Sequence, residues 1–411
     1  MSLEIIEKKV FETFCNTVPY KSFMQSVEMA NLLKKRGYQV TYLGLRDDEQ
    51  LQVAAVLFSL PMTGGLHMEI NSGPVSRDKR YLKQFYQELQ AYAKANNALE
   101  LLVKPYDTYQ HFDTNGEPTD QENTALLKDF LSLGYHHDGL LTGYPGGEPD
   151  WHYVKDLTDI TEANLLKSFS KKGRPLVKKA KTFGITLRKL DRDELPLFKE
   201  ITSATSDRRD YDDKSLDYYQ DFYDSFGDSC EFMVASLNFQ DYLANLEADQ
   251  SKLNQKIDKL KTALENHTVS EKKQNQLREL SSQSATFDTR IAEAKEFIDK
   301  YGSQNVILAG SLFVYTKQEA VYLFSGSYPE FNKFYAPALL QEYVMLEAIK
   351  RGITIYNLLG ITGHFDGTDG VLRFKQNYNG YITRKMGTFR YYPRPLKYKV
   401  IHNLKKLLRR Y

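Results

Sequence analysis

The 411-residue chain has little of what several protein classes depend on. It holds only two cysteines, Cys15 and Cys230, far apart and outside any CxxC pair, so neither a disulfide framework nor a zinc site is expected. No apolar run approaches the ~20 residues that span a bilayer, and no secretory signal peptide is evident. The sequence therefore favours a protein of the reducing cytosol.

The common catalytic motifs are also missing. The chain has no GxxxxGK[ST], GxSxG or HExxH sequence, which argues against nucleotide hydrolysis and two large hydrolase classes. Its glycine-rich stretch LLGITGHFDGTDG (358–370) lacks the R/Q-x-x-G-x-G/A pattern with which acetyltransferases grip the CoA pyrophosphate. We therefore predict neither a metal nor a cofactor.

Acidic residues are absent from two long tracts, 163–190 and 370–411, although the net charge of the whole chain is only +2. Both tracts are rich in lysine and arginine, so one surface is expected to be positive and to suit polyanions. In the second tract Leu396, Val400, Leu404 and Leu407 or Leu408 share one helical face. Such a helix suits an anionic membrane surface, or it packs on its own domain.

Two parts of the chain share one order of elements. A hairpin (38–60), a helix (78–96) and a strand (98–105) are followed later by a hairpin (305–327), a helix (335–352) and a strand (353–360). We predict an α+β fold of two acetyltransferase-like (GNAT-like) domains with an antiparallel coiled-coil hairpin inserted in the second. The predicted divisions are 1–153 for the first domain, 154–238 with 304–395 for the second, 239–303 for the arm and 396–411 for a basic C-terminal helix.

The inserted arm is predicted from a seven-residue repeat on both sides of a polar break. Phe239, Leu246, Leu253 and Leu260 recur at that spacing, and the register returns through Leu280, Phe287, Ala294 and Tyr301. This pattern is typical of two helices folded back on each other. At 1.5 Å per residue each arm of about 28 residues reaches roughly 40 Å. The arm either guides a substrate or binds a second copy of the chain.

Several segments resemble the Fem-type (FemABX) branching aminoacyltransferases of peptidoglycan synthesis, a family that includes the streptococcal MurM and MurN proteins. The resemblance lies in SFMQSVEMANLLKKRGYQV (22–40), RPLVKKAKTFGI (174–185), DDKSLDYYQDFY (212–223), FYAPALLQEYVMLEAIKRG (334–352) and GVLRFKQNYNG (370–380), together with the inserted heptads. The N-terminal stretch is more similar to MurN than to MurM.

The resemblance implies a function. It implies a cytoplasmic aminoacyltransferase that moves an amino acid from aminoacyl-tRNA to the stem peptide of lipid II. The resemblance also allows peripheral contact with the inner face of the membrane. The MurN-like stretch favours L-alanine as the second residue of the branch. Alanine, serine or glycine as the first residue is the alternative. The expected partners are then charged tRNA and either lipid II or its branched form. DNA is not expected as a partner.

Site residues follow from the same resemblance. Lys375 after Phe374 matches the family residue implicated in aminoacyl transfer. The precursor-binding set is Lys35 (or its neighbour Lys34), Tyr38, Lys214, Tyr218, Arg208 (or Arg209) and Tyr322. At Lys214 the family has an arginine, so a bidentate grip is lost there. At a position where the family has an acidic residue, a candidate base, this chain has Lys104. Asp107 lies close by in the sequence. The tRNA-binding set is Lys171, Lys172, Arg174, Lys178, Lys179 and Arg373.

Two other functions remain open from the sequence. A CoA-dependent N-acyltransferase would share the fold, but the missing pyrophosphate motif argues against it. A non-catalytic, tRNA-binding coiled-coil adaptor would show salt-dependent RNA binding and no product.

Overall fold

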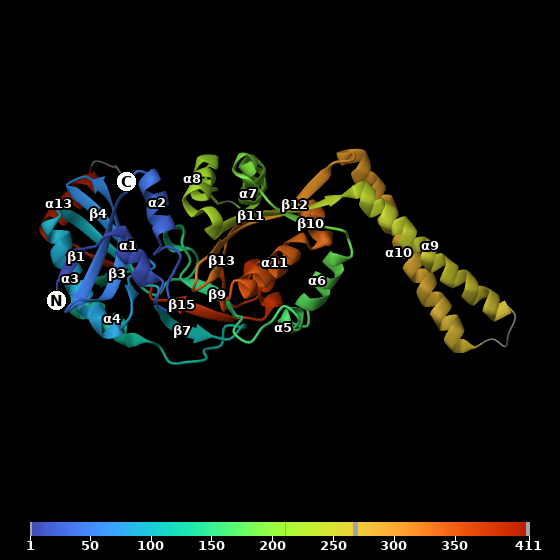
Figure 1. Cartoon of the computed structure of the whole chain (residues 1–411), viewed down its shortest axis with the longest axis horizontal. Coiled ribbons are helices and arrows are strands. Elements are labelled where there is room, and N and C mark those ends of the chain that lie inside the picture. Colours follow the sequence, from blue (N-terminus) through green and yellow to red (C-terminus); the bar gives the residue numbers. More distant parts are fainter. Residues whose placement is uncertain (1, 210, 266–269, 408–411) are drawn as a thin grey trace.

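The computed structural model of the chain describes residues 2–209, 211–265 and 270–407. Among these residues the strands form two eight-stranded sheets that lie next to each other, and a helical arm projects from the second (Figure 1). No helix within the described ranges is long and apolar enough to cross a membrane.

The first sheet is built mainly from the N-terminal part of the chain. Its spatial order is β1 (Leu3–Ile5), β2 (Gln39–Asp47), β3 (Gln50–Met62), β4 (Gly65–Asn71), β6 (Ala98–Lys104), β16 (Phe389–Tyr391) and β8 (His136–His137), with β5 (Val75–Ser76) on β3. Alternate residues of β3 face opposite sides. Val53 and Ala55 pack with α3 (Leu82–Ala95) and α4 (Thr124–Ser132), and Ala54 packs with α1 (Lys8–Cys15) and α2 (Val27–Lys35).

The second sheet draws its strands from more distant segments. Its order is β10 (Thr186–Lys189), β11 (Cys230–Asn238), β12 (Asn305–Tyr315), β13 (Ala320–Ser327), β14 (Ile355–Ile361), β9 (Trp151–Asp156), β15 (Tyr381–Lys385) and β7 (Thr108–Phe112). On one face lies α11 (Ala336–Lys350), with α5 (Leu165–Ser168) and α6 (Gly173–Lys181). A separate apolar cluster joins α7 (Leu195–Arg209) and α8 (Leu216–Phe226) to the sheet.

The repeated order of hairpin, helix and strand is confirmed. It is β2–β3, α3 and β6 in the first half, and β12–β13, α11 and β14 in the second. The two halves also exchange strands: β7 pairs with β15 in the second sheet, whereas the C-terminal β16 pairs with β6 in the first. The strand pairing thus crosses the predicted division at residue 153, and the boundaries themselves stay a prediction.

A buried polar network lies where the halves meet. Glu319, 3% exposed, accepts hydrogen bonds from Tyr106 Oη (2.6 Å), Asn357 Nδ2 (3.2 Å) and the Phe23 amide (3.4 Å). Lys385 Nζ donates to the carbonyl of Tyr106 at 3.0 Å and lies 3.7 Å from the centre of its ring. This network ties the β12–β13 turn to the N-terminal half.

The arm consists of α9 (Phe239–Glu265) and α10 (Glu271–Tyr301), which pack against each other and project from the body (Figure 1). The helix-turn-helix arm predicted from the seven-residue repeat is therefore observed, although its tip, residues 266–269, lies outside the described residues. Gln250, a polar residue in the apolar repeat, donates to Asp288 across the pair at 2.6 Å.

The root of the arm is aromatic. Tyr242 and Phe297, which the repeat did not include, are buried there with Phe239. Phe239 stacks on Phe297 with 4.5 Å between ring centres, and Phe334 packs against both rings. Because Phe334 lies in the short connection between β13 and α11, these contacts anchor the arm to the second half.

The C-terminal helix α13 (Pro395–Leu407) covers the first sheet with only one of its sides. Ile401 sits over Gly64, and Tyr398 packs on Tyr392 with 4.1 Å between ring centres. The predicted apolar row remains outside, with Leu396 80%, Val400 58%, Leu404 51% and Leu407 81% exposed. Residues 408–411 of the predicted 396–411 helix, Leu408 included, lie outside the described residues.

Candidate active site

Two parallel strands separate next to Lys375. Strands β13 and β14 pair only at Ala320–Tyr356 and Val321–Asn357. Beyond that point β14 bulges, and Leu359 takes a left-handed φ of 56°. Lys375 Nζ donates to the carbonyls of Leu359 (3.0 Å) and Gly360 (2.5 Å). The lysine therefore supplies donors to backbone carbonyls on the strand that has left its parallel neighbour.

A short helix places Lys375 at this point. Helix α12 (Gly370–Lys375) begins at Asp369, whose carboxylate accepts the amides of Val371 (2.8 Å) and Leu372 (3.1 Å). The same carboxylate accepts the hydroxyl of Thr362 at 2.9 Å, which connects the start of the helix to the end of β14. An aspartate at this position is a favourable N-cap. It fixes the helix, and so the direction from which Lys375 approaches.

Burial sets the protonation of Lys375. The residue is 3% exposed, and loss of solvation lowers its pKa to about 7. The carboxylate of Asp369 opposes this shift, and the nearby guanidinium of Arg209 adds to it. Of the three N–H donors of the ammonium, two are used by Leu359 and Gly360. One donor remains for a bound group.

Other polar groups surround this lysine. Tyr322, on the diverging part of β13, is close enough to Arg209 for the guanidinium to lower its pKa, although burial has the larger effect and raises it. Burial raises the pKa of Tyr144 to about 12; the nearby carboxylate of Asp369 adds to this shift and the guanidinium of Arg209 opposes it. Arg208 points elsewhere and donates to the carbonyl of Ser327 at 3.1 Å. The structure thus brings Tyr322 and Arg209, more than Arg208, to the Lys375 region.

The other predicted precursor-binding residues lie between α2 and α8. Lys35 forms an ion pair with Asp224 at 3.2 Å, and its neighbour Arg36 pairs with Asp221 at 3.3 Å. Tyr38 packs edge-on against Phe58 in the first sheet. Lys35 therefore bridges the two halves in this conformation, and a precursor would have to compete with Asp224 for its ammonium.

Lys214 and Tyr218 belong to the second half and lie together. The ammonium of Lys214 is 5.4 Å from the centre of the Tyr218 ring. Burial raises the pKa of Tyr218 to about 12, and Arg36 of the first half lies close enough to oppose that shift. Tyr218 therefore lies near a cation from each half, Arg36 of the first and Lys214 of the second.

Lys104, which stands where the family has an acidic residue, and the nearby Asp107 both form ion pairs. Lys104 pairs with Glu69 at 3.1 Å and with Glu148 at 2.8 Å. Asp107 pairs with Lys79 at 2.5 Å. The carboxylate of Asp107 is therefore already engaged by a neighbouring cation.

Most of the predicted tRNA-binding residues lie on or next to α6, which packs on α11 through Val177 and Ala180. Its first residue, Gly173, lies so close to the carbonyl of Asn377 that an added Cβ would be 2.1 Å from that oxygen. The helix therefore starts directly on the segment that follows Lys375. The members of the set on or next to this helix are all exposed: Lys171, Lys172, Arg174, Lys178 and Lys179.

Two cations of this set are partly engaged, and one lies on α12. Arg174 donates to the carbonyl of Phe169 at 2.9 Å, and Lys179 lies 5.4 Å from the centre of the Tyr335 ring. Arg373 is exposed and lines a hollow of about 160 Å³ with His364 and Gln376. Arg373 and Lys375 thus occupy opposite sides of α12, one exposed and one buried.

Comparison with known proteins identifies the family of this chain. Residues 6–406 match the FemAB family. The chain belongs to the FemAB family. Aminoacyltransferase FemA of Staphylococcus aureus, in the bovine strain RF122 / ET3-1 and in strain N315, is 28% identical over 398 residues, which are 95% of this chain and 94% of FemA. A crystal structure of FemX matches with a TM-score of 0.77 and 22% identity, over 98% of this chain and 100% of that one.

These findings confirm two predictions. The family is the one that the sequence motifs indicated, and the α+β fold with two acetyltransferase-like halves is shown. The more specific likeness to MurM and MurN stays a prediction, as do the roles of the individual site residues.

Sequence reasoning missed two residues of this FemAB site. Asp369 was passed over within the glycine-rich stretch, although an aspartate directly before an apolar, basic helix is a recognisable N-cap signal. Tyr144 had no signal, because it reaches the site only through the contact of its loop with Gly360, where an added Cβ would be 2.8 Å from its ring.

The pKa of Lys375 predicts a dependence of stability on pH. Between about pH 7 and its ordinary pKa near 10.4, the unfolded chain holds a proton that the folded chain has lost. The free energy of unfolding of the native protein relative to Lys375→Met should therefore rise with pH in this window, by up to about 1.4 kcal/mol per pH unit. Urea unfolding from pH 6 to pH 9 measures it. The exposed Lys171→Met is the control, and equal slopes for the two variants would refute the burial argument.

Proposed function

We propose that this chain transfers an amino acid from aminoacyl-tRNA to the stem peptide of lipid II in the synthesis of peptidoglycan cross-bridges. The observation that carries the proposal is the family match over residues 6–406, which includes both halves and the arm. Relatives with 28% identity over nearly the whole chain are named aminoacyltransferases. The enzyme is then an acyltransferase that needs no cofactor, because its donor is already an activated ester.

The chemistry needs orientation, a neutral amine and stabilisation of a tetrahedral oxyanion. Deprotonating a lysine ε-amine of pKa near 10.4 at pH 7 costs about 4–5 kcal/mol, whereas an α-amine of pKa near 8 costs about 1–1.5 kcal/mol. An enzyme that adds the second residue attacks with an α-amine, so it can work without a strong base. The third N–H of the Lys375 ammonium would then donate to the oxyanion or to the terminal phosphate of the tRNA.

The precursor would bind between the halves. Lys35, Tyr38, Lys214 and Tyr218 lie near the contact of α2 with α8. Arg208 donates to the last residue of β13, and Tyr322 lies near the start of that strand. We infer that the precursor extends from the seam between the halves toward Lys375. Phosphate groups of the precursor would replace Asp224 and Asp221 as partners of Lys35 and Arg36.

The tRNA would bind along α6 and reach α12. The exposed cations of α6 begin where that helix touches the segment after Lys375, so a backbone bound there can extend its terminus toward Arg373 and the buried lysine. Binding through phosphates should weaken steeply with salt.

The arm is expected to add to tRNA binding. We predict that replacing residues 250–288 with a short Gly-Ser linker raises the KM for charged tRNA several-fold and leaves the KM for the precursor unchanged. This deletion keeps the aromatic root, including Tyr242 and Phe297, so the body stays intact. Steady-state kinetics with each substrate varied in turn decide the matter. Unchanged tRNA kinetics would reduce the arm to a scaffold.

The C-terminal helix is expected to touch the membrane that carries lipid II. Its exposed apolar row would enter the interface while Lys397, Lys399, Lys405 and Lys406 face anionic headgroups. We predict that the chain sediments with vesicles containing phosphatidylglycerol, and that the double variant Leu404→Asp/Leu407→Asp does not. Ile401→Leu, on the packed side, is the control. Equal sedimentation of all three would contradict membrane docking.

The finer proposal is L-alanine as the second residue of the branch, at the cytoplasmic face of the membrane. Purified protein would be incubated with alanyl-, seryl- or glycyl-tRNA and with precursor that carries or lacks a first branch residue. The mass of the product identifies donor and position. Extension of only the unbranched precursor would establish the first-residue alternative. RNA binding without any product would establish the adaptor.

A further inference from the structure

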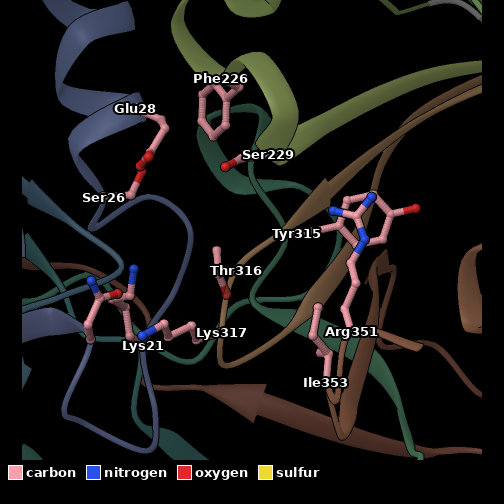
Figure 2. A pocket seen from close by; sticks show the side chains of 11 residues that line it. Lys21, Ser26, Glu28, Phe226, Ser229, Tyr315, Thr316, Lys317, Arg351 and Ile353 are labelled. Atoms are coloured by element: carbon pink, nitrogen blue, oxygen red, sulfur yellow. The ribbon is translucent and has the colours of Figure 1, made fainter. Parts of the chain in front are cut away.

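A cavity of about 310 Å³ lies on the seam between the halves, away from Lys375 (Figure 2). The first half contributes Lys21 and the start of α2 with Ser26 and Glu28. The second half contributes Ser229 after α8, the β12–β13 turn with Lys317, and the segment before β14 with Arg351. The cavity lies at the start of β14, whereas Lys375 binds the end of that strand. At 3.3 Å per residue the two are roughly 20 Å apart.

Lys21 is the unusual residue of this cavity. Its side chain is only 8% exposed, and no hydrogen bond or ion pair to its ammonium is found among the residues that the structure describes. The aliphatic stem of Lys21 is covered, whereas its ammonium opens into the cavity and is available to an anionic group. Figure 2 shows the Lys21 side chain at the same side of the cavity as Lys317. Lys317 likewise has no ion pair within the described ranges.

The charges of the lining favour an anion. Arg351 is already neutralised by Glu231 at 2.8 Å, which leaves two ammonium groups against the single carboxylate of Glu28. Phe226 and Ile353 line the same cavity and provide apolar surface for an organic body. The volume exceeds that of a bare phosphate and lies at the lower end of the range for small-molecule sites.

The walls are held in place without a ligand. Gln318, next to Lys317, donates to the carbonyls of Cys15 (3.0 Å) and Val18 (2.9 Å) in the first half. Arg351 stacks on Tyr315 at 3.9 Å, and Tyr315 donates to Glu231 at 2.8 Å. The cavity is therefore preformed by contacts that do not depend on Lys21.

We propose that this cavity binds a small phosphorylated organic molecule, with its phosphate between Lys21 and Lys317 and its body against Phe226 and Ile353. Because Lys21 belongs to one half and Lys317 to the other, such a ligand would clamp the halves together from the side opposite the transfer site. The inference does not depend on the proposed transfer reaction.

Isothermal titration of the full chain with phenyl phosphate, at fixed ionic strength, tests this site. We expect saturable 1:1 binding whose Kd rises about tenfold or more in Lys21→Met and in Lys317→Met, since each change removes a charged hydrogen-bond donor. Lys317 is exposed, so its variant tests the site without disturbing the core.

Two controls complete the test. Lys94→Met removes an exposed lysine elsewhere, and Lys35→Met removes one from the proposed precursor site; both should bind phenyl phosphate as the native chain does. The proposal is overturned if the native chain shows no saturable binding, if Lys317→Met binds equally well, or if Lys35→Met alone abolishes binding.

Discussion

Replacing Lys375 with methionine is expected to lower kcat for aminoacyl transfer by about 10²–10³, the usual cost of losing one donor to a developing oxyanion. The KM for the lipid II precursor should change little. The buried ammonium has one N–H left after bonding Leu359 and Gly360, and that donor serves the transition state more than the ground state. Equal losses in turnover and precursor affinity would contradict this role.

Arg373→Met is the matched control for this experiment. Arg373 lies on the same helix, but its side chain is exposed and proposed to contact tRNA. Its loss should raise the KM for charged tRNA and leave kcat nearly unchanged. A similar fall in kcat for both variants would indicate damage to α12 in place of a specific role for Lys375.

The pH profile gives an independent readout of the same lysine. With the pKa of Lys375 near 7, the ammonium is lost as pH rises through neutrality, so kcat should fall on the alkaline side. In Lys375→Met this descending limb should disappear. The acidic limb, set by the attacking α-amine of pKa near 8, should remain.

Removing Glu319 is expected to have the largest effect on stability. Glu319→Leu should lower the free energy of unfolding by about 3–5 kcal/mol, because it leaves Lys385 buried without a counter-charge and takes the acceptor from Tyr106 and Asn357. Burial lowers the pKa of Lys385 to about 8, and the carboxylate of Glu319 opposes that shift and keeps the ammonium charged at pH 7. Tyr106 and Asn357 would each lose a hydrogen-bond partner.

The control for this prediction is a glutamate of the same type in an exposed pair. Glu330 bonds Lys300 at 2.7 Å, where both side chains face solvent. Glu330→Leu should therefore cost less than about 1 kcal/mol. Urea unfolding followed by fluorescence and by circular dichroism measures both variants. Similar losses at the two positions would show that the network at the seam is not what joins the halves.

The sequence predicted those parts of the fold that depend on local order. The arm was found because its contacts repeat every seven residues within two continuous helices. The hairpins and helices of both halves were found because period and turn signals lie within each segment. The exchange of strands was not predictable: β7, β15 and β16 are short, and each pairs with a segment far away in the chain.

The site was predictable only in part for the same reason. Lys375 came from a resemblance in a continuous motif, GVLRFKQNYNG, but its burial depends on the separation of β13 from β14. That separation is a property of the sheet that no single segment encodes. The ion pair of Lys35 with Asp224 likewise joins residues 189 positions apart.

Transfer of label from charged tRNA to lipid II is the most direct test of this account. The purified chain would receive tRNA carrying a radiolabelled amino acid, lipid II or its branched form, and neither ATP nor CoA. The account predicts that the label moves from the RNA to the lipid fraction in the native protein and not in Lys375→Met. No transfer from alanyl-, seryl- or glycyl-tRNA, or transfer only when an acyl-CoA is added, would contradict it.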